Sequence, residues 1–398
     1  MNFVIANVGA RFYTCRMFPV LDLTGTPFNR GKIIGQLARS QVVGSVRCYA
    51  ALFAACGIEW QEAQRRAAEF HDIVAGCGGG IMEEIEGIAL GSGFNVNEIL
   101  ALNCRTEILP PSFLSMETVN SDQARRKNAA LGLFDIGECT SVAVTGKRCA
   151  DGHTRVAQNW DWIGYQRQNV LALRVHRDAP WPSYLTLTEA GIVAKIGVNE
   201  AGVGVGLNIL RATNDRQQLG IPVHIFQRMA LDCVSVKAVV SLAQSLVFSA
   251  SSNAILGDAS GHVCSLEYSP GGAAPVSEDH GVVAHTNHFC DATLSKIQAP
   301  LTQMLTTEPR LACANHHING WPDYIEDAHL QALLRDESGV GVAAAEAKFG
   351  AICRSPDPSL PVELQVESVF GVIIDCVARD MWVAPDVPSK VEFERIAL

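Results

Sequence analysis

The sequence has no uninterrupted apolar run of the roughly 18 residues that a membrane-spanning helix needs. It also has little charge, because only 18% of its 398 residues are Asp, Glu, Lys or Arg, and the formal net charge is −10. Nucleic acids and anionic membranes require clustered Lys and Arg, and the one short basic cluster, residues 125–127, lies in a polar stretch typical of a solvated loop. We therefore expect neither nucleic acid nor a membrane as a partner.

No two of the 13 cysteines have the C-x-x-C spacing, and their number is odd. In a chain of this length, that pattern indicates free thiols in a reducing compartment and argues against a disulfide framework. The first residues lack the basic segment and long apolar run of a secretory signal, and Met17 is an alternative start to Met1. We therefore expect a cytoplasmic protein.

What the sequence does contain is a large apolar fraction, 48% of all residues, enough for a well-packed globular core. The first third has helical periodicity, with apolar residues one helical turn apart from Gly31 to Val46. Pro110 and Pro111 end this region, and residues 112–130 are polar without either period. We expect a helical N-terminal segment, 1–138, that ends in an exposed linker at about 108–138.

From Cys139 onward the pattern changes to short strands, with helices set between them. We expect strands at 141–144, 154–160, 170–175, 183–191, 192–198, 203–210, 252–259, 262–269, 282–287, 368–375 and 381–385. Helices are expected at about 224–246, 293–305 and 322–335. Meandering strands separated by helices are typical of antiparallel sheet covered by helices, an α+β fold.

Three short motifs resemble known binding sites but fail on spacing or context. Residues 25–33 have one residue too many between the glycines of a phosphate loop, and 202–206 lie inside a strand and open no helix. His285 and His288, near Cys290, lie three residues apart at a strand end, where their side chains are expected on opposite faces of the strand. We therefore expect no bound metal and no nucleotide cofactor.

Cys139 lies in mid-chain, just where the strand pattern begins, after the acidic and turn-like stretch FDIGE. It is either a small core residue or a nucleophile that becomes active once the chain is cut between Glu138 and Cys139. A cut there gives Cys139 a thiol nucleophile and a free α-amine, which titrates near 7.7–8.0 in reference peptides and can act as a base near neutral pH. The same thiol can make the cut, by attacking the carbonyl of Glu138 and shifting the acyl group from nitrogen to sulfur.

The chain resembles the acyl-coenzyme A:isopenicillin N (6-aminopenicillanic acid) acyltransferase family of N-terminal nucleophile (Ntn) hydrolases. The matching stretches are GTPFNRG (25–31), IEGIALGSG (85–93), LNCRTE (102–107), ECTS (138–141), AQNWDW (157–162), TEAGIVAKIGVNEAGVGV (188–205), HTNH (285–288) and ICR (352–354). The resemblance implies an αββα sandwich of two stacked, mainly antiparallel sheets flanked by helices. It also implies self-cleavage into chains 1–138 and 139–398, which stay together as one globular heterodimer, alone or within a higher oligomer.

The resemblance assigns roles to five residues. Cys139 is the nucleophile, Ser141 a hydroxyl residue of the processing site, and Asp161 the carboxylate that supports the N-terminal residue. Asn287 supplies a side-chain amide to the oxyanion hole, and Arg354 lines the site. Fixed amide donors and a carboxylate beside an ammonium suit this chemistry. Each of the last three residues, taken singly, has a structural alternative. Asp161 can hydrogen-bond a turn, Asn287 can cap a strand end, and Arg354 can pair with a surface carboxylate.

The resemblance implies an amidohydrolase or acyltransferase that acts through an acyl-cysteine thioester on a small N-acyl or N-aminoacyl amide, without a cofactor. One alternative is an N-acyltransferase that takes acyl-CoA as co-substrate. Another is an uncleaved, inactive homologue that binds a ligand, because Glu138 replaces the glycine that precedes the nucleophile in the fungal penicillin enzyme. Three aromatic residues line a hydrophobic pocket or pack in the core: Trp160, Trp162 and Tyr165.

Overall fold

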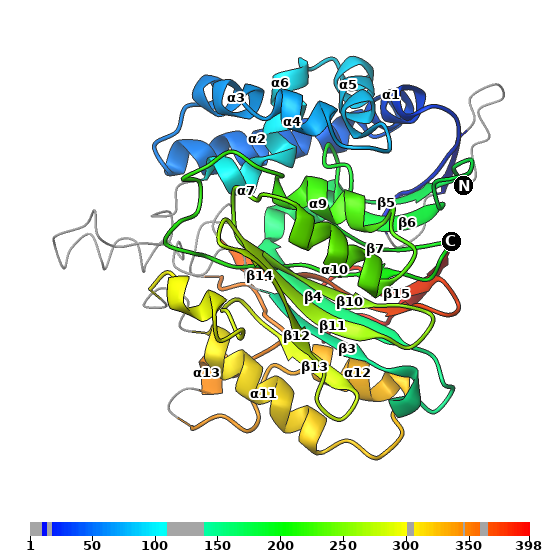
Figure 1. The fold of residues 1–398 in the computed structure, drawn as a ribbon, viewed down its shortest axis with the longest axis vertical. Coiled ribbons are helices and arrows are strands. Elements are labelled where there is room, and N and C mark those ends of the chain that lie inside the picture. Colours follow the sequence, from blue (N-terminus) through cyan, green and yellow to red (C-terminus); the bar gives the residue numbers. More distant parts are fainter. Residues whose placement is uncertain (1–9, 14–17, 110–138, 301–305, 345–346, 359–364) are drawn as a thin grey trace, which may run out of the picture.

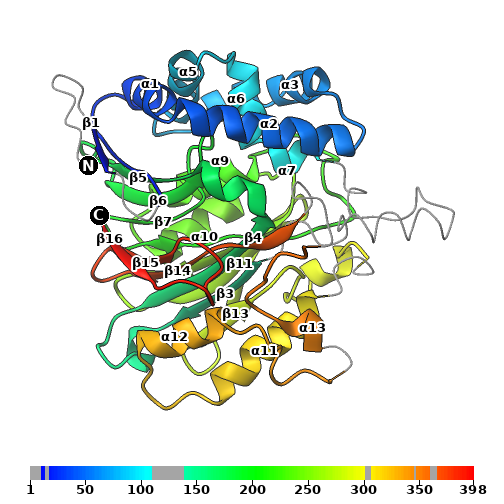
Figure 2. The same cartoon turned by 180° about the vertical axis from the view of Figure 1, so that it is seen from behind.

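The computed structural model describes residues 10–13, 18–109, 139–300, 306–344, 347–358 and 365–398. These residues form four layers, with a helical layer, two stacked sheets and a second helical layer in that order (Figure 1). The view from behind shows the same order of layers (Figure 2). The predicted αββα sandwich of mainly antiparallel sheets is therefore confirmed.

The larger sheet has ten strands in the order β1-β2-β5-β6-β7-β8-β10-β11-β12, with β9 paired to β10, and only β2 and β5 pair in parallel. Its strands are β1 (Ala10–Tyr13), β2 (Val20–Leu23), β5 (Val170–Val175), β6 (Tyr184–Glu189), β7 (Ile196–Asn199), β8 (Gly204–Val205), β9 (Asn208–Ile209), β10 (Ser252–Gly257), β11 (Val263–Ser269) and β12 (Gly272–Ser277). The N-terminal segment, expected to be helical, therefore also contributes two strands to this sheet, with β1 at its edge and β2 between β1 and β5.

The smaller sheet has six strands in the order β13-β3-β4-β14-β15-β16, all antiparallel. Its strands are β3 (Cys139–Val144), β4 (Arg155–Ile163), β13 (Val282–His285), β14 (Val366–Asp375), β15 (Asp380–Ala384) and β16 (Glu394–Ala397). Every residue of β3, β4 and β14 is buried, because the other sheet covers one face and helices cover the other. Polar side chains on these strands are therefore held inside the protein.

Helices cover the outer face of each sheet (Figures 1 and 2). The N-terminal layer consists of α1 (Pro27–Leu37), α2 (Arg39–Ala55), α3 (Trp60–Ala68), α4 (His71–Ala75), α5 (Ile81–Ser92), α6 (Val96–Asn103) and α7 (Arg105–Ile108). The remaining helices are α9 (Val223–Ala230), α10 (Val236–Ser245), α11 (Thr307–Asn319), α12 (Asp327–Leu334) and α13 (Ala347–Gly350). Among the described residues, no single helix has the length and apolar character to cross a membrane, and only the bent pair α2 and α3, which meet at 102°, passes that test together.

Helices α1 and α5 come from two of the stretches that carry the family resemblance, and they pack directly against each other. A Cβ on Gly31 would lie 2.0 Å from the Glu84 carbonyl oxygen, and one on Gly87 would lie 2.1 Å from the Phe28 carbonyl oxygen. The two backbones therefore touch at a distance that only glycine allows. A buried ion pair between Arg30 and Glu84, at 3.0 Å, joins the same two helices.

The expected helix over 293–305 is wrong. Its described part, residues 293–300, holds a short 3₁₀ turn, Leu294–Ile297, and no α-helix, and the helix α11 begins later, at Thr307. Pro300 disfavours helical geometry in the residue before it, whereas Pro309 lies in the first turn of α11, where the missing N–H costs little. This shift matters because α11 carries a residue of the candidate site.

Candidate active site

Cys139 is the first residue of β3, in the smaller sheet between β13 and β4, and it is 1% exposed. Polar side chains hold its backbone on both sides. Its N–H donates to Asn287 Oδ1 at 2.8 Å, and its carbonyl oxygen accepts from Arg310 Nη1 at 2.7 Å and from Asn208 Nδ2 at 3.1 Å. Glu138 lies outside the described residues. The predicted nucleophile is therefore fixed in place by residues from distant parts of the chain.

Asp161 lies on β4, next to Trp160, which is the strand partner of Cys139. One carboxyl oxygen accepts from the Ser368 hydroxyl at 2.6 Å, and the other is buried without a hydrogen-bond partner among the described residues. Burial raises the pKa of Asp161 to about 7, while the positive charge of Arg310 and the Ser368 hydrogen bond lower it. Asp161 therefore holds no turn, because it lies inside a strand beside the candidate nucleophile.

The thiol of Cys139 is enclosed with this carboxyl. The pKa of Cys139 is raised to about 12, first by burial and then by the charge of Asp161, although a hydrogen bond from the Asp161 backbone, Arg310 and Lys195 act to lower it. The thiol of the continuous chain is therefore protonated at neutral pH. Its use as a nucleophile requires a base beside it, and Asp161 is a group of suitable pKa.

Asn287 lies two residues beyond the end of β13. Its Oδ1 accepts from the Cys139 N–H and from Arg310 Nη2 at 2.9 Å, and its Nδ2 donates to the Ile209 carbonyl at 2.9 Å. Both partners of Oδ1 are donors only, so chemistry requires the amide to have this orientation. Asn287 thus touches the candidate nucleophile, and its N–H, the expected oxyanion donor, is engaged with β9 in the continuous chain.

Arg310, on α11, is the residue that sequence reasoning missed. Its guanidinium is fully buried and contacts the Cys139 carbonyl, the Thr140 hydroxyl at 3.0 Å and Asn287 Oδ1. The stretch TEPRLACANHH reads as an ordinary surface helix, and no motif marks the arginine. The available signal was its position one turn before Cys313, on the buried face of the helix.

Ser141 reaches the site through another missed residue, Asn208 on β9. Ser141 Oγ donates to Asn208 Oδ1 at 2.6 Å, and Asn208 Nδ2 donates to the Cys139 carbonyl. Asn253, on β10, also donates to Asn208 Oδ1 at 3.0 Å. Asn208 therefore connects the larger sheet to the start of β3, and its signal in the sequence was an amide inside an otherwise apolar strand.

The backbone of Arg354 is hydrogen-bonded to Ser368, a residue that contacts Asp161. Its N–H donates to the Ser368 hydroxyl at 2.9 Å, and its carbonyl accepts from the Ser368 N–H at 2.9 Å. The Ser368 hydroxyl in turn donates to Asp161. Ser368, on β14, was not predicted, and it joins Arg354 to the carboxyl.

The two tryptophans expected either in a pocket or in the core are core residues. Trp160 and Trp162 are both 2% exposed and stack with ring centroids 6.4 Å apart. Lys195 Nζ lies 3.6 Å from the centre of the Trp160 ring, and Arg105 lies 4.3 Å from that of Trp162. Tyr165 is 39% exposed and lies outside this stack.

A sequence model of the acyl-coenzyme A:6-aminopenicillanic acid acyl-transferase family matches residues 146–355, more than half of the chain. The chain belongs to this family. The matched range begins downstream of Cys139 and contains Asp161, Asn287, Arg310 and Arg354. The family is described by an acyl-transferase activity.

The acyltransferase-family chain is also similar to individual proteins. The 40 kDa form of acyl-coenzyme A:6-aminopenicillanic-acid-acyltransferase from Emericella nidulans is 29% identical over 312 residues, covering 77% of this chain and 75% of that protein. Among solved structures, penicillin V acylase from Agrobacterium tumefaciens has a TM-score of 0.40 at 15% identity, over 62% of this chain and 82% of its own. A mutant of the conjugated bile acid hydrolase from Clostridium perfringens has a TM-score of 0.41 at 11% identity, over 65% of this chain and 97% of its own.

Proposed function

We propose that this family member is a cysteine Ntn amidohydrolase or acyltransferase that activates itself by cutting the chain between Glu138 and Cys139. One observation carries the proposal. The backbone of Cys139, whose nitrogen would become the catalytic α-amine, is held by Asn287 on one side and Arg310 on the other, with Asp161 beside the thiol. A structural cysteine at a strand start needs none of these contacts.

In self-cleavage, the Cys139 thiol gives its proton to Asp161 and attacks the carbonyl carbon of Glu138. A carbon–sulfur bond forms, the Glu138–Cys139 carbon–nitrogen bond breaks, and the proton passes from Asp161 to the departing nitrogen. Water then hydrolyses the thioester, which leaves a carboxylate on Glu138 and restores the thiol. A carboxyl with a pKa of about 7 suits this role, because it can both accept and return a proton near neutral pH.

In turnover, the α-amine of Cys139 is the base and the thiol attacks the substrate carbonyl. The oxyanion of the tetrahedral intermediate is held by the Asn287 amide once that amide leaves the Ile209 carbonyl. The substrate carbon–nitrogen bond breaks, and the amine leaves with the proton that the α-amine took from the thiol. The acyl group then passes from the Cys139 sulfur to water or to an acceptor amine, and the thiol is restored. We propose a small N-acyl or N-aminoacyl amide as substrate, with no cofactor in the scheme.

Acyl transfer from acyl-CoA is the second candidate, and the acyl-coenzyme A acyltransferase activity for which the Emericella relative is named favours it. The cleaved N-terminal segment is proposed to remain bound in either case. Strand β2 pairs with β5, so the segment is part of the larger sheet, and its helices cover that sheet. A cytoplasmic location remains a prediction.

Intact-protein mass spectrometry of the wild type beside Cys139→Ala tests the proposal. Two fragments that meet at Glu138/Cys139 in the wild type, and one uncut mass in the variant, are expected. The cleaved enzyme is then incubated with N-acyl amides and with acyl-CoA plus an amine, and the mass of the acylated chain beginning at Cys139 identifies the donor. A single uncut mass in both proteins would overturn self-activation and leave the ligand-binding alternative.

A further inference from the structure

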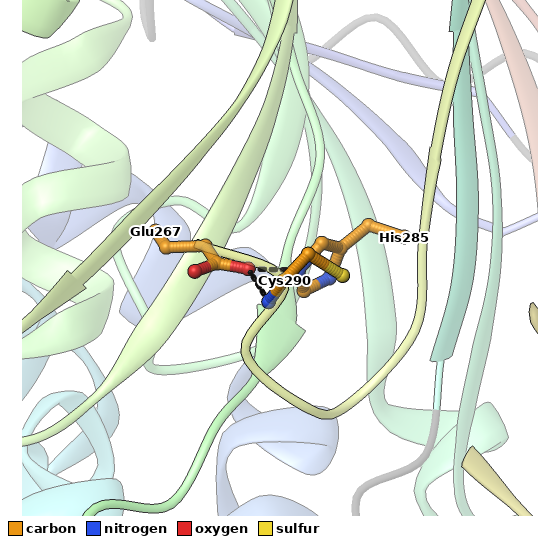
Figure 3. Close-up of side chains that lie close together, drawn as sticks. All are labelled: Glu267, His285 and Cys290. Carbon is orange, nitrogen blue, oxygen red and sulfur yellow. Dashed lines mark hydrogen bonds and ion pairs between the residues drawn. The ribbon is translucent and has the colours of Figure 1, made fainter. Parts of the chain in front are cut away.

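A second cluster of reactive side chains lies near the active site and takes no part in the proposed reaction (Figure 3). It consists of Glu267 on β11, His285 at the end of β13 and Cys290 in the loop that follows. One donor atom from each residue lies within 4.8 Å of the others. The expectation that the side chains of His285 and His288 lie on opposite faces of a strand is wrong, because the strand ends at His285 and the two ring centroids are 6.5 Å apart.

The contacts around the cluster orient its donor atoms. His285 Nδ1 faces the Thr286 carbonyl at 2.8 Å, so Nε2 points to Glu267 Oε1 at 2.7 Å. The Glu267 carboxylate accepts the backbone N–H of Cys290 at 2.6 Å and that of Asp291 at 3.0 Å. Histidines and carboxylates that bind metals usually have such outer contacts, which fix the ring and the carboxylate in place.

We propose that Glu267, His285 and Cys290 bind one zinc ion. A thiolate, an imidazole and a carboxylate form a donor set that suits zinc and excludes the hard cations magnesium and calcium. Three protein ligands leave a fourth position for water, and Cys290 is exposed, so the ion can enter from solvent. On binding, the thiol and His285 Nε2 release their protons and the metal replaces the His285–Glu267 hydrogen bond.

A similar cluster, formed by Cys313 and His317 on α11 and Asp336 just after α12, is less suited to a metal. Its donor atoms also lie within 4.8 Å of one another. The Asp336 carboxylate accepts from His317 and from the backbone of Ser338 and Gly339, much as Glu267 does from its neighbours, but Cys313 is buried whereas Cys290 is exposed. This second cluster provides a matched control.

The ion would join the two sheets beside the candidate nucleophile. Glu267 belongs to the larger sheet and His285 to the smaller one, and Asn287 lies between His285 and Cys290 in the chain. A metal here fixes both ends of the loop that carries Asn287. The expected effect is a stabilised fold, because the ion binds the folded chain and not the unfolded one.

The test uses the full chain, freed of metal with a chelator and titrated with Zn²⁺ alone against a chromophoric competitor. One tightly bound equivalent is expected in the wild type and in Cys313→Ser, and none in Cys290→Ser. Co²⁺ should give a sulfur-to-cobalt charge-transfer band that Cys290→Ser lacks. Zn²⁺ should raise Tm in the wild type and leave it unchanged in Cys290→Ser, whose metal-free Tm should match that of the wild type.

Two results would overturn the site: a wild type that binds no equivalent, or a Cys290→Ser variant that keeps it. Loss of the bound zinc equivalent in Cys313→Ser alone would assign the ion to the cluster of Cys313, His317 and Asp336, and would equally refute the proposal. Zinc binding is measured without turnover, so its outcome is independent of the proposed self-cleavage.

Discussion

Changing Asp161 to Asn in the uncut Cys139→Ala background should stabilise the protein, and more so at high pH. The pKa of Asp161 is raised by burial to about 7 from 3.8, and none of its causes involves the Cys139 thiol. Between these values the folded chain holds a proton that the unfolded chain has lost, so stability falls as pH rises through this window. At 1.36 kcal/mol per pKa unit, the cost is about 2 kcal/mol at pH 5 and about 4 kcal/mol at pH 8.

Asparagine removes this titration, keeps the oxygen that accepts from Ser368 and retains the shape of the side chain. Urea unfolding of Cys139→Ala and Cys139→Ala/Asp161→Asn at pH 5 and pH 8 should show a gain that grows by about 2 to 3 kcal/mol between the two conditions. Lys195, whose pKa burial lowers to about 7, titrates in the same range but is present in both proteins and cancels.

Asp323→Asn, at an exposed position, is the control and should change stability equally at both pH values. A gain from Asp161→Asn that is the same at pH 5 and pH 8 would refute the reasoning. It would mean that the carboxyl is already ionised at pH 5, with a partner for its second oxygen.

Three further predictions concern the site and its support. Arg310→Lys keeps the charge but loses the planar fork that reaches three acceptors, so self-cleavage should slow at least about tenfold in intact-mass time courses, and unchanged cleavage would contradict its positioning role. Ser368→Ala removes a hydrogen bond that lowers the pKa of Asp161, so the pH midpoint of self-cleavage should rise; a midpoint that stays or falls excludes Asp161 as the base. Gly87→Ala should cost about 1–3 kcal/mol by calorimetry, because its Cβ would meet the facing backbone at 2.1 Å. Gly320→Ala, where the nearest contact is an ordinary 3.5 Å, should cost less than about 0.5 kcal/mol, and equal losses would contradict the close packing.

Local patterns in the sequence were enough to predict antiparallel sheet covered by helices, whereas the stacking of two sheets between two helical layers was implied by the family resemblance. Strands such as β5 and β14 are short apolar runs bounded by turn residues, and both sheets bury such runs on two faces. The start of α6 is also determined locally, because Asn95 and Glu98 form a reciprocal capping box. Two other features were not predicted from local patterns. Edge strand β1 forms because it pairs with β2, and the start of α11 depends on the position of a proline.

The residues of the site also fall into two groups, those that the sequence indicates and those that only the folded structure reveals. Cys139 and Asp161 are predictable together, since they lie on adjacent paired strands and within matched stretches. Arg310, Asn208 and Ser368 come from a helix, the other sheet and a distant strand, and only the packing of the layers brings them to Cys139. The residues next to these three in the sequence give no indication that their side chains lie near Cys139.

Among the described residues, one carboxyl oxygen of Asp161 has no hydrogen-bond partner, and the amine that cleavage would create offers a partner for it. A buried carboxyl without a second partner is costly, and the raised pKa of Asp161 measures that cost in the continuous chain. Cutting before Cys139 would convert an uncharged peptide nitrogen into an amine that can carry positive charge, close to this carboxyl. The cut would therefore relieve a cost that the folded precursor bears, which makes the start of β3 a favourable place for the chain to break and gives the mature base a counter-charge in the same step.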